Sequence, residues 1–255
     1  MMSETVDVDG YEVTITQDED ASDPLSEDYG VAGTMATWHS RYRLGNIQPG
    51  IPPEKYLRAQ VPYKVIEDLD RRLDRVKNRE YEYRYSIRSG DSTFRFDYDK
   101  IREGLETRIG KVSDEWIRDN LVKLDVYLYD HSGLRLSSAP FGCPWDSGQL
   151  GFFFLTPEEV LKEWDGDKKK AKDYLEATLK TYGQYVAGEV FGVSGIEDPD
   201  GEEVEDGSCW GFYGYDNEAS GLMEFVRDAI NQDRISKAVE RQERFNAACR
   251  DIVTV

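Results

Sequence analysis

Apolar and polar residues alternate near the start of the chain as they do in a half-buried strand. Residues 11–16, YEVTIT, place bulky or β-branched side chains at every second position. An acidic loop follows, and residues 33–46 mix aromatic residues with arginine before the Gly- and Pro-containing stretch 45–53. The pattern predicts one strand here and a break in regular structure near residue 50.

The spacing becomes helical after Tyr63, where charged residues occupy the remaining faces. The apolar positions of this predicted helix are Val65, Leu69, Leu73 and Val76. Residues 81–87 and 93–98 alternate around the turn sequence SGDS and predict a β-hairpin. Two short helices are expected after it, over about 100–109 and 113–123.

The last third begins with three short apolar runs separated by glycine-containing turns, which predict a sheet buried on at least one face. Thr156, Pro157 and Glu159 have the spacing of a capping box and predict a helix through Trp164. A second helix is expected from about Lys168. Two strand-like segments, EVFGVSGI and CWGFYGY, then precede a long helix predicted from about Asn217.

These elements predict an α+β fold in which one mixed or antiparallel sheet is packed by helices. Charge is distributed unevenly, and this suggests the domain organisation. Residues 51–123 are nearly neutral, with seventeen Lys and Arg against fifteen Asp and Glu. We therefore expect residues 1–47 and 124–255 to form the main domain and residues 48–123 to form an inserted helix-hairpin-helix subdomain.

Composition places the chain among folded proteins of a reducing compartment. Hydrophobic residues make up 39% and aromatic residues 12% of the 255 positions, which is too much apolar bulk for a disordered chain. Cys143, Cys209 and Cys249 are odd in number and widely spaced, unlike a disulfide framework. No leader-like or membrane-spanning run is visible, so we expect a cytoplasmic protein that does not bind membranes.

The formal net charge of −19 disfavours direct binding to nucleic acid and favours a partner with a basic surface. Residues 1–30 hold ten acids and no base, and residues 197–206 hold seven acids. The predicted partner-binding residues are Asp18, Glu19, Asp20, Asp23, Glu27, Asp28, Glu202, Glu203, Glu205 and Asp206. Solubility, or life in a salt-rich cytoplasm, is an equally good explanation of the acidity.

Chemistry-bearing residues are few, and no catalytic signature is present, so an enzyme is the less favoured interpretation. His131 and Cys143 lie on neighbouring predicted strands, where Asp130 or Asp146 could orient a Cys-His nucleophile pair. The weak catalytic candidates are therefore His131, Cys143 and Asp146. A buried structural thiol is the more common role of such a cysteine.

A ligand pocket is the other chemical possibility. Its candidate residues come from the aromatic, glycine-rich segments: His39, His131, Trp145, Cys209 and Trp210. A hydrophobic core explains the same aromatic density more simply. No CxxC, HExxH, GxGxxG or P-loop spacing occurs, so we expect no metal and no cofactor.

Five motifs in order, GTMATWHSRYRLG, YLYDHSG, FGCPWDSGQLGF, TYGQYVAGEVFG and GSCWGFYG, resemble an uncharacterised protein family encoded by phages, plasmids and integrative elements. The resemblance covers roughly residues 10–47 and 124–216, and residues 48–123 are an addition to its pattern. It implies an origin in a mobile element, and it implies no catalytic residue.

Three functions follow as hypotheses. The first is an acidic interaction protein that inhibits a host defence system, with mimicry of nucleic acid as one way to bind a basic host protein. The second is an enzyme or small-molecule-binding protein with a His/Cys/Asp pocket. The third is a structural or regulatory protein of the element. The oligomeric state stays open.

Overall fold

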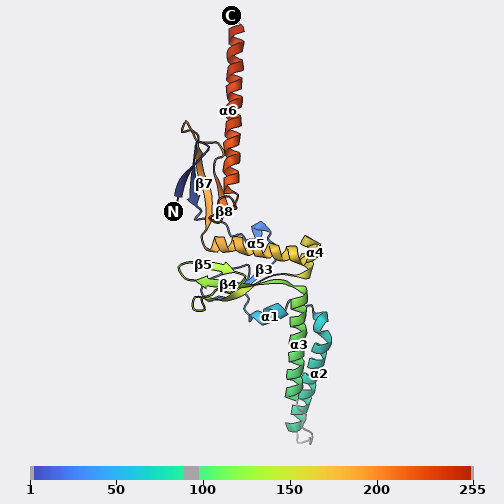
Figure 1. Ribbon diagram of the computed structural model, residues 1–255. Helices are drawn as coiled ribbons and strands as arrows, with labels where there is room; N and C mark the ends of the chain where they lie inside the picture. The colour runs from blue at the N-terminus through green and yellow to red at the C-terminus, as the bar shows by residue number, and fades with distance from the viewer. Residues whose placement is uncertain (1–2, 89–97, 254–255) are drawn as a thin grey trace. The chain divides into compact units, whose positions relative to one another are not determined.

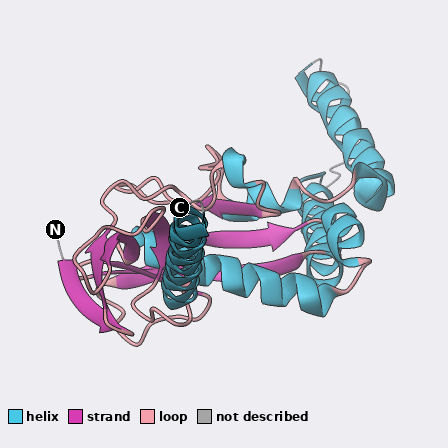
Figure 2. Cartoon of the chain, turned by 90° about the horizontal axis from the view of Figure 1, so that it is seen from above, coloured by secondary structure: helices cyan, strands magenta, loops and turns pink. Residues whose placement is uncertain are grey.

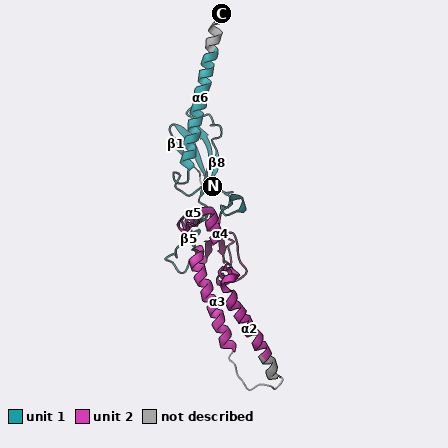
Figure 3. Ribbon diagram, turned by 90° about the vertical axis from the view of Figure 1, so that its right-hand side faces the viewer, with its two compact units in different colours: residues 1–31, 127–148, 177–255 teal, residues 32–126, 149–176 magenta. Residues whose placement is uncertain are grey.

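The computed structural model describes residues 3–88 and 98–253, and its chain divides into two compact units (Figures 1 and 3). Unit 1 comprises residues 1–31, 127–148 and 177–255, and unit 2 comprises residues 32–126 and 149–176. Both are built from antiparallel strands and helices, which confirms the predicted α+β class (Figure 2).

Unit 1 contains a four-stranded antiparallel sheet of order β1-β2-β7-β8. Its strands and the long helix α6 that packs on it have these bounds: β1 Ser3–Val8, β2 Tyr11–Gln17, β7 Val190–Glu197, β8 Cys209–Tyr213 and α6 Leu222–Val253. The short 3-10 helix η1 spans Glu27–Tyr29. Leu222, Val226 and Ile230 of α6 are buried against Val13 and Val193 of the sheet. This apolar contact holds the first half of α6 in place.

A second antiparallel sheet has the order β3-β6-β4-β5. Its strands are β3 Thr34–Thr37, β4 Val122–Asp130, β5 Leu134–Ser137 and β6 Ser147–Leu155. The prediction of a single sheet was therefore wrong. Strands of both sheets have the same kind of sequence pattern. Alternation of apolar and polar residues shows that one face of a strand is buried, but it does not show which sheet the strand joins.

The remaining helices belong mainly to unit 2, with α5 continuing into unit 1. Their bounds are α1 Pro53–Arg58, α2 Tyr63–Arg88, α3 Tyr98–Asn120, α4 Pro157–Trp164 and α5 Lys168–Val186. Leu57, Ile117, Leu121 and Phe154 form the buried cluster where α1 and α3 meet the strands.

The predicted hairpin at 81–87 is wrong, since these residues continue helix α2. The two short helices expected after it are one helix, α3, which lies beside α2 (Figure 1). Buried Glu80 of α2 accepts a hydrogen bond from Arg102 of α3 at 3.1 Å. This contact joins the two helices just before the segment in which the local alternation favoured a strand. Residues 93–97 of the predicted second strand lie outside the described residues, and Tyr98 begins α3.

All of the predicted insertion, residues 48–123, belongs to unit 2, together with residues 32–47, 124–126 and 149–176. That it was inserted into a shorter ancestral chain stays a prediction. The capping box at Thr156 and the helix from Lys168 are confirmed. The last helix begins at Leu222 and not near Asn217. The Asp216 carboxylate caps a turn at Glu218 and Ala219, and Gly221, with a φ angle of 84°, separates this turn from the helix.

Candidate functional site

An acidic groove of about 560 Å³ lies between the turn that follows β7 and the first half of α6. Val204, Phe225 and Ala229 contribute apolar surface to it. Its carboxylate side chains are Glu202, Glu203, Glu205, Asp206, Asp228, Asp233 and Glu240. Among the lining residues that the structure describes, Lys237 is the one cation. The groove therefore presents a strongly negative surface that also includes apolar side chains.

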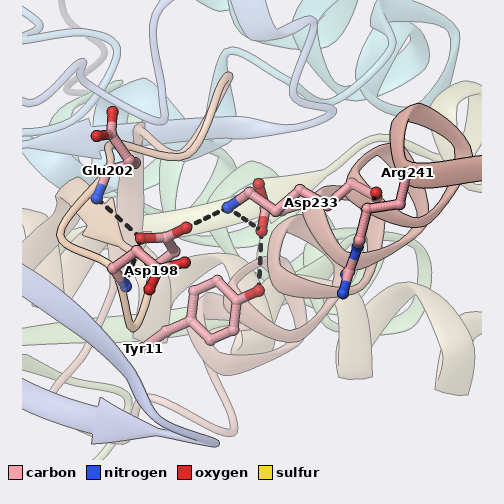
Figure 4. Close-up of polar contacts among 7 residues, drawn as sticks. Tyr11, Asp198, Glu202, Asp233 and Arg241 are labelled. Carbon is pink, nitrogen blue, oxygen red and sulfur yellow. Dashed lines mark hydrogen bonds and ion pairs between the residues drawn. The ribbon is translucent and has the colours of Figure 1, made fainter. Parts of the chain in front are cut away.

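Lys237 is itself held by two carboxylates, those of Asp198 and Asp233, which Figure 4 labels. Its Nζ donates to Asp233 at 2.8 Å and also to Asp198. The Asp198 side chain is only 3% exposed and that of Asp233 11%, so water screens these contacts poorly. The hydrogen bond to Asp198, followed by that to Asp233, raises the pKa of Lys237 above its ordinary value. The cation of the groove is thus already neutralised by its own chain.

Asp198 also organises the acidic turn. Its Oδ1 accepts the backbone N–H groups of Asp200 at 2.9 Å and Glu202 at 2.8 Å. The hydrogen bond from Lys237, and then those from the backbone, hold the pKa of Asp198 below its ordinary value. Sequence reasoning treated residues 197–206 as a solvated acidic turn and missed this buried carboxylate. The Asp-Pro-Asp-Gly sequence, in which an Asp side chain caps the following turn, was the available signal.

Tyr11 joins β2 to the same network. Its hydroxyl donates to Asp233 at 2.8 Å, and burial is the largest cause that raises its pKa. Arg234 of α6 lies over the Tyr11 ring, 5.3 Å from its centroid, and donates to the Asp9 carbonyl at 3.0 Å. The turn, the β1-β2 hairpin and α6 are therefore linked through polar contacts, and the groove is preformed.

The ten predicted partner-binding residues fall into two groups. Glu202, Glu203, Glu205 and Asp206 line the groove. The other six lie after β2: Asp18, Glu19, Asp20, Asp23, Glu27 and Asp28. Asp18 accepts the backbone N–H of Asp20, and Asp23 accepts that of Leu25, so these two carboxylates stabilise local turns. None of the six lines the groove.

Tyr213 of β8 anchors the acidic N-terminal loop. Its hydroxyl donates to the Ser22 carbonyl at 2.8 Å. Burial, followed by the neighbouring Tyr29, Asp18 and Asp23, raises the pKa of Tyr213 to about 12. The loop is thus attached to the unit 1 sheet at a point where its carboxylates act on a half-buried phenol.

The three weak catalytic candidates come together in unit 1. Asp146 Oδ2 lies 3.4 Å from His131 Nδ1 and 3.7 Å from Cys143 Sγ. The backbone N–H of Asp130 donates to the Asp146 carbonyl at 2.8 Å. A cysteine nucleophile needs its thiol beside the base, whereas the described side-chain partner of Cys143 is the carboxylate. The arrangement is that of an exposed, hydrogen-bonded loop in which Asp146 occupies the central position.

The predicted pocket residues occupy three places. Trp145 is 92% exposed and lies in the same loop as Cys143. Cys209 and Trp210 belong to β8, where the indole of Trp210 lies against Gly192 of β7. His39 belongs to unit 2, where its Nδ1 accepts the N–H groups of Arg41 and Tyr42, both at 3.2 Å. His39 and Trp210 thus each have a local structural contact.

Within the described ranges, no group of three or more His, Cys, Asp or Glu side chains is arranged to hold a metal ion. None of the helices in those ranges has an apolar stretch long enough to cross a membrane. The chain matches no family model, no curated protein and no solved structure. The acidic groove and the Asp146 cluster are therefore assessed on their chemistry alone.

Proposed function

We propose that this chain is an acidic interaction protein of a phage or mobile element that inhibits a host defence system by binding a basic, nucleic-acid-binding surface of a host protein. The acidic groove carries the proposal. It has seven carboxylates, and its one lysine is paired within the chain. Carboxylates held on a preformed surface attract Lys and Arg groups that ordinarily contact phosphates.

Five groove carboxylates are in position to meet a partner. Among the described contacts, no ion pair is formed by the side chains of Glu202, Glu203, Glu205, Asp206 or Asp228. The apolar surface of the groove suits the aliphatic stems of Lys and Arg, which pack on apolar atoms while their charged ends stay hydrated. The chemistry thus favours a basic protein surface over a neutral ligand.

The test neutralises part of the groove and compares it with an equal change of charge elsewhere. Glu203→Gln, Glu205→Gln and Asp206→Asn form the groove variant. The matched control carries Glu103→Gln, Glu106→Gln and Glu115→Gln, which are exposed positions on α3. Both variants have a net charge three units less negative, so total charge cannot explain a difference between them.

Tagged chains are used to capture partners from host lysate at about 50 mM and about 500 mM salt, across which the screening length falls severalfold. We expect the parent and the control to retain one basic host protein at low salt and to release it at high salt. The groove variant should lose it. Capture that is undiminished at high salt would contradict the electrostatic interpretation, and full anti-defence activity of the groove variant would favour a structural or regulatory role.

The Asp146 cluster supports a second candidate, an enzyme or small-molecule-binding protein. The observation in its favour is that one carboxylate oxygen lies within 4 Å of both an imidazole and a thiol. His131→Ala and Cys143→Ser should then each abolish anti-defence activity while leaving capture of the basic partner intact. Full activity in both variants would eliminate this candidate.

A further inference from the structure

A small pocket of about 180 Å³ in unit 1 shares no lining residue with the acidic groove. Its walls come from β1, β2, β7 and the segment after β8, and they consist of Ser3, Glu4, Ile15, Phe191, Tyr215 and Asn217. Pockets for drug-sized ligands have volumes of about 300 to 1,000 Å³. This smaller pocket therefore suits a single functional group on a short stem.

The apolar part of the pocket combines buried core residues with one exposed ring. Ile15 and Phe191 are 3% and 9% exposed and belong to the core that the sheet forms with α6. The Tyr215 ring lies against that of Phe191, with 5.3 Å between the ring centroids and 51° between the ring planes. Tyr215 is 66% exposed, so much of its surface is accessible to a ligand. The pocket thus has a fixed apolar wall and an aromatic ring that a ligand can cover.

The polar groups of the pocket favour a cation. Glu4 supplies a carboxylate and Asn217 an amide, and none of the six lining residues is basic. Within residues 3–88 and 98–253, neither of these two side chains forms a hydrogen bond or an ion pair. A neutral ligand that filled the pocket would displace water from the carboxylate without compensating its charge. A cation compensates that charge, and its hydrogen bonds to a carboxylate are stronger than those of a neutral donor.

We propose that this pocket binds a guanidinium group on an apolar stem, as an arginine side chain or a small alkylguanidine carries it. A guanidinium is planar and weakly hydrated, so it can stack on an aromatic ring while its N–H groups donate to oxygen acceptors. It stacks on Tyr215 and donates to the Glu4 carboxylate and the Asn217 amide oxygen. Its stem packs on Ile15 and Phe191. An ammonium group is more strongly hydrated and has no flat face, so it fits this site less well.

The first measurement follows the amide signals of the full chain by NMR while two guanidinium compounds are added separately. They are butylguanidinium and Nα-acetyl-arginine methylamide. Both should shift the Tyr215 backbone amide and the Asn217 side-chain amide, with dissociation constants on the order of 1 mM. Nα-acetyl-citrulline methylamide, which has a similar shape and no charge, should bind at least about tenfold more weakly. Tighter binding of the arginine compound would identify a protein side chain as the natural source, and tighter binding of butylguanidinium would identify a small molecule; both support a guanidinium site.

Two substitutions test the assigned contacts. Glu4→Gln should raise the dissociation constant of butylguanidinium at least about tenfold, and Tyr215→Leu, which removes the ring and keeps an apolar side chain, about fivefold. Glu12→Gln is the matched control, because Glu12 is an exposed residue of β2 that does not line the pocket, and it should leave binding unchanged. Circular dichroism should show that each variant keeps the parent's secondary structure.

The triple groove variant described above should bind butylguanidinium as the parent does, so failure of this pocket and failure of the groove are distinguishable. Three results would overturn the proposal. The first is no shift of the Tyr215 and Asn217 signals at guanidinium concentrations up to about 50 mM. The second is equal binding of the citrulline and arginine compounds. The third is equal binding of butylguanidinium by the Glu4→Gln and Glu12→Gln variants.

Discussion

Replacing Gly192 with alanine is expected to disrupt the pairing of β7 with β8. A Cβ atom at this position would lie 2.3 Å from Cε3 of the Trp210 indole and 2.9 Å from the Cys209 carbonyl oxygen. Carbon atoms in contact are ordinarily about 3.5 to 4.0 Å apart. The new methyl group would therefore overlap the indole by more than about 1 Å, and the indole would have to move away from the strand.

The size of the effect follows from how much of Trp210 is covered. The residue is 49% exposed, so roughly half of the area that a buried Trp removes from water, about 100 Å², is at stake. At about 25 cal/mol per Å², complete loss of that contact costs about 2.5 kcal/mol. A small shift of the indole would lower this cost, and displacement of the Cys209 carbonyl would raise it. Overpacked sites generally cost about 1 to 3 kcal/mol. We therefore expect Gly192→Ala to destabilise the pairing of β7 with β8 by about 2 kcal/mol.

Native-state hydrogen exchange of the β8 amides measures this change where it occurs. The Gly192→Ala variant should exchange about 30-fold faster, which corresponds to about 2 kcal/mol. Gly195→Ala is the matched control on the same strand, because nothing lies within 4 Å of its added Cβ, and its β8 exchange should be unchanged. Equal exchange in the two variants would refute the contact of the Trp210 indole with Gly192. It would favour the alternative in which Trp210 lines a ligand pocket.

Three further outcomes follow from described contacts. Thr156→Ala removes the capping box of α4 and should lower the free energy of unfolding by about 1 kcal/mol in urea titrations. Thr181→Ala, at a half-buried position inside α5 whose hydroxyl donates to the Ala177 carbonyl one turn back, should change it little. Because the pKa of Asp198 is lower in the folded chain than in the unfolded one, its contribution to stability is present above the unfolded pKa and is lost as the pH falls through the folded pKa. Acid unfolding monitored by circular dichroism should therefore show a steeper loss in the parent than in Asp198→Asn. Since the pKa of Tyr213 is raised to about 12, the late phase of a spectrophotometric phenol titration should lose one group in Tyr213→Phe.

Local sequence determined the elements whose stabilising contacts lie within a few residues. The α4 start is one, since Thr156 and Glu159 satisfy each other's backbone N–H groups at 2.7 and 3.3 Å. Strand β2 is another, because its alternation matches one buried face. Strand β1 was missed although Asp9-Gly10, with φ angles of 57° and 88°, is the two-residue turn that joins it to β2.

The segment 81–87 shows where local pattern fails. Its alternating aromatic residues favour a strand by propensity, yet it is helical beside α3. Propensities of this kind differ by about 1 kcal/mol or less per residue, so the local alternation does not by itself decide between a strand and a helix. The sequence pattern of α2 and α3 does not by itself show that the two helices pack together.

The candidate site divides in the same way. Sequence reasoning identified the acidic turn and grouped His131, Cys143 and Asp146, because acid content and rare residue types can be read from the sequence without knowledge of the fold. It did not identify the network that joins Tyr11 and Asp198 to Asp233 and Lys237 of α6, since these three parts of the network are far apart in the chain. A lysine pairs with a buried carboxylate only when two distant segments fold side by side. Charge and local elements were thus determined by the sequence itself, and tertiary structure decided which carboxylates became a groove.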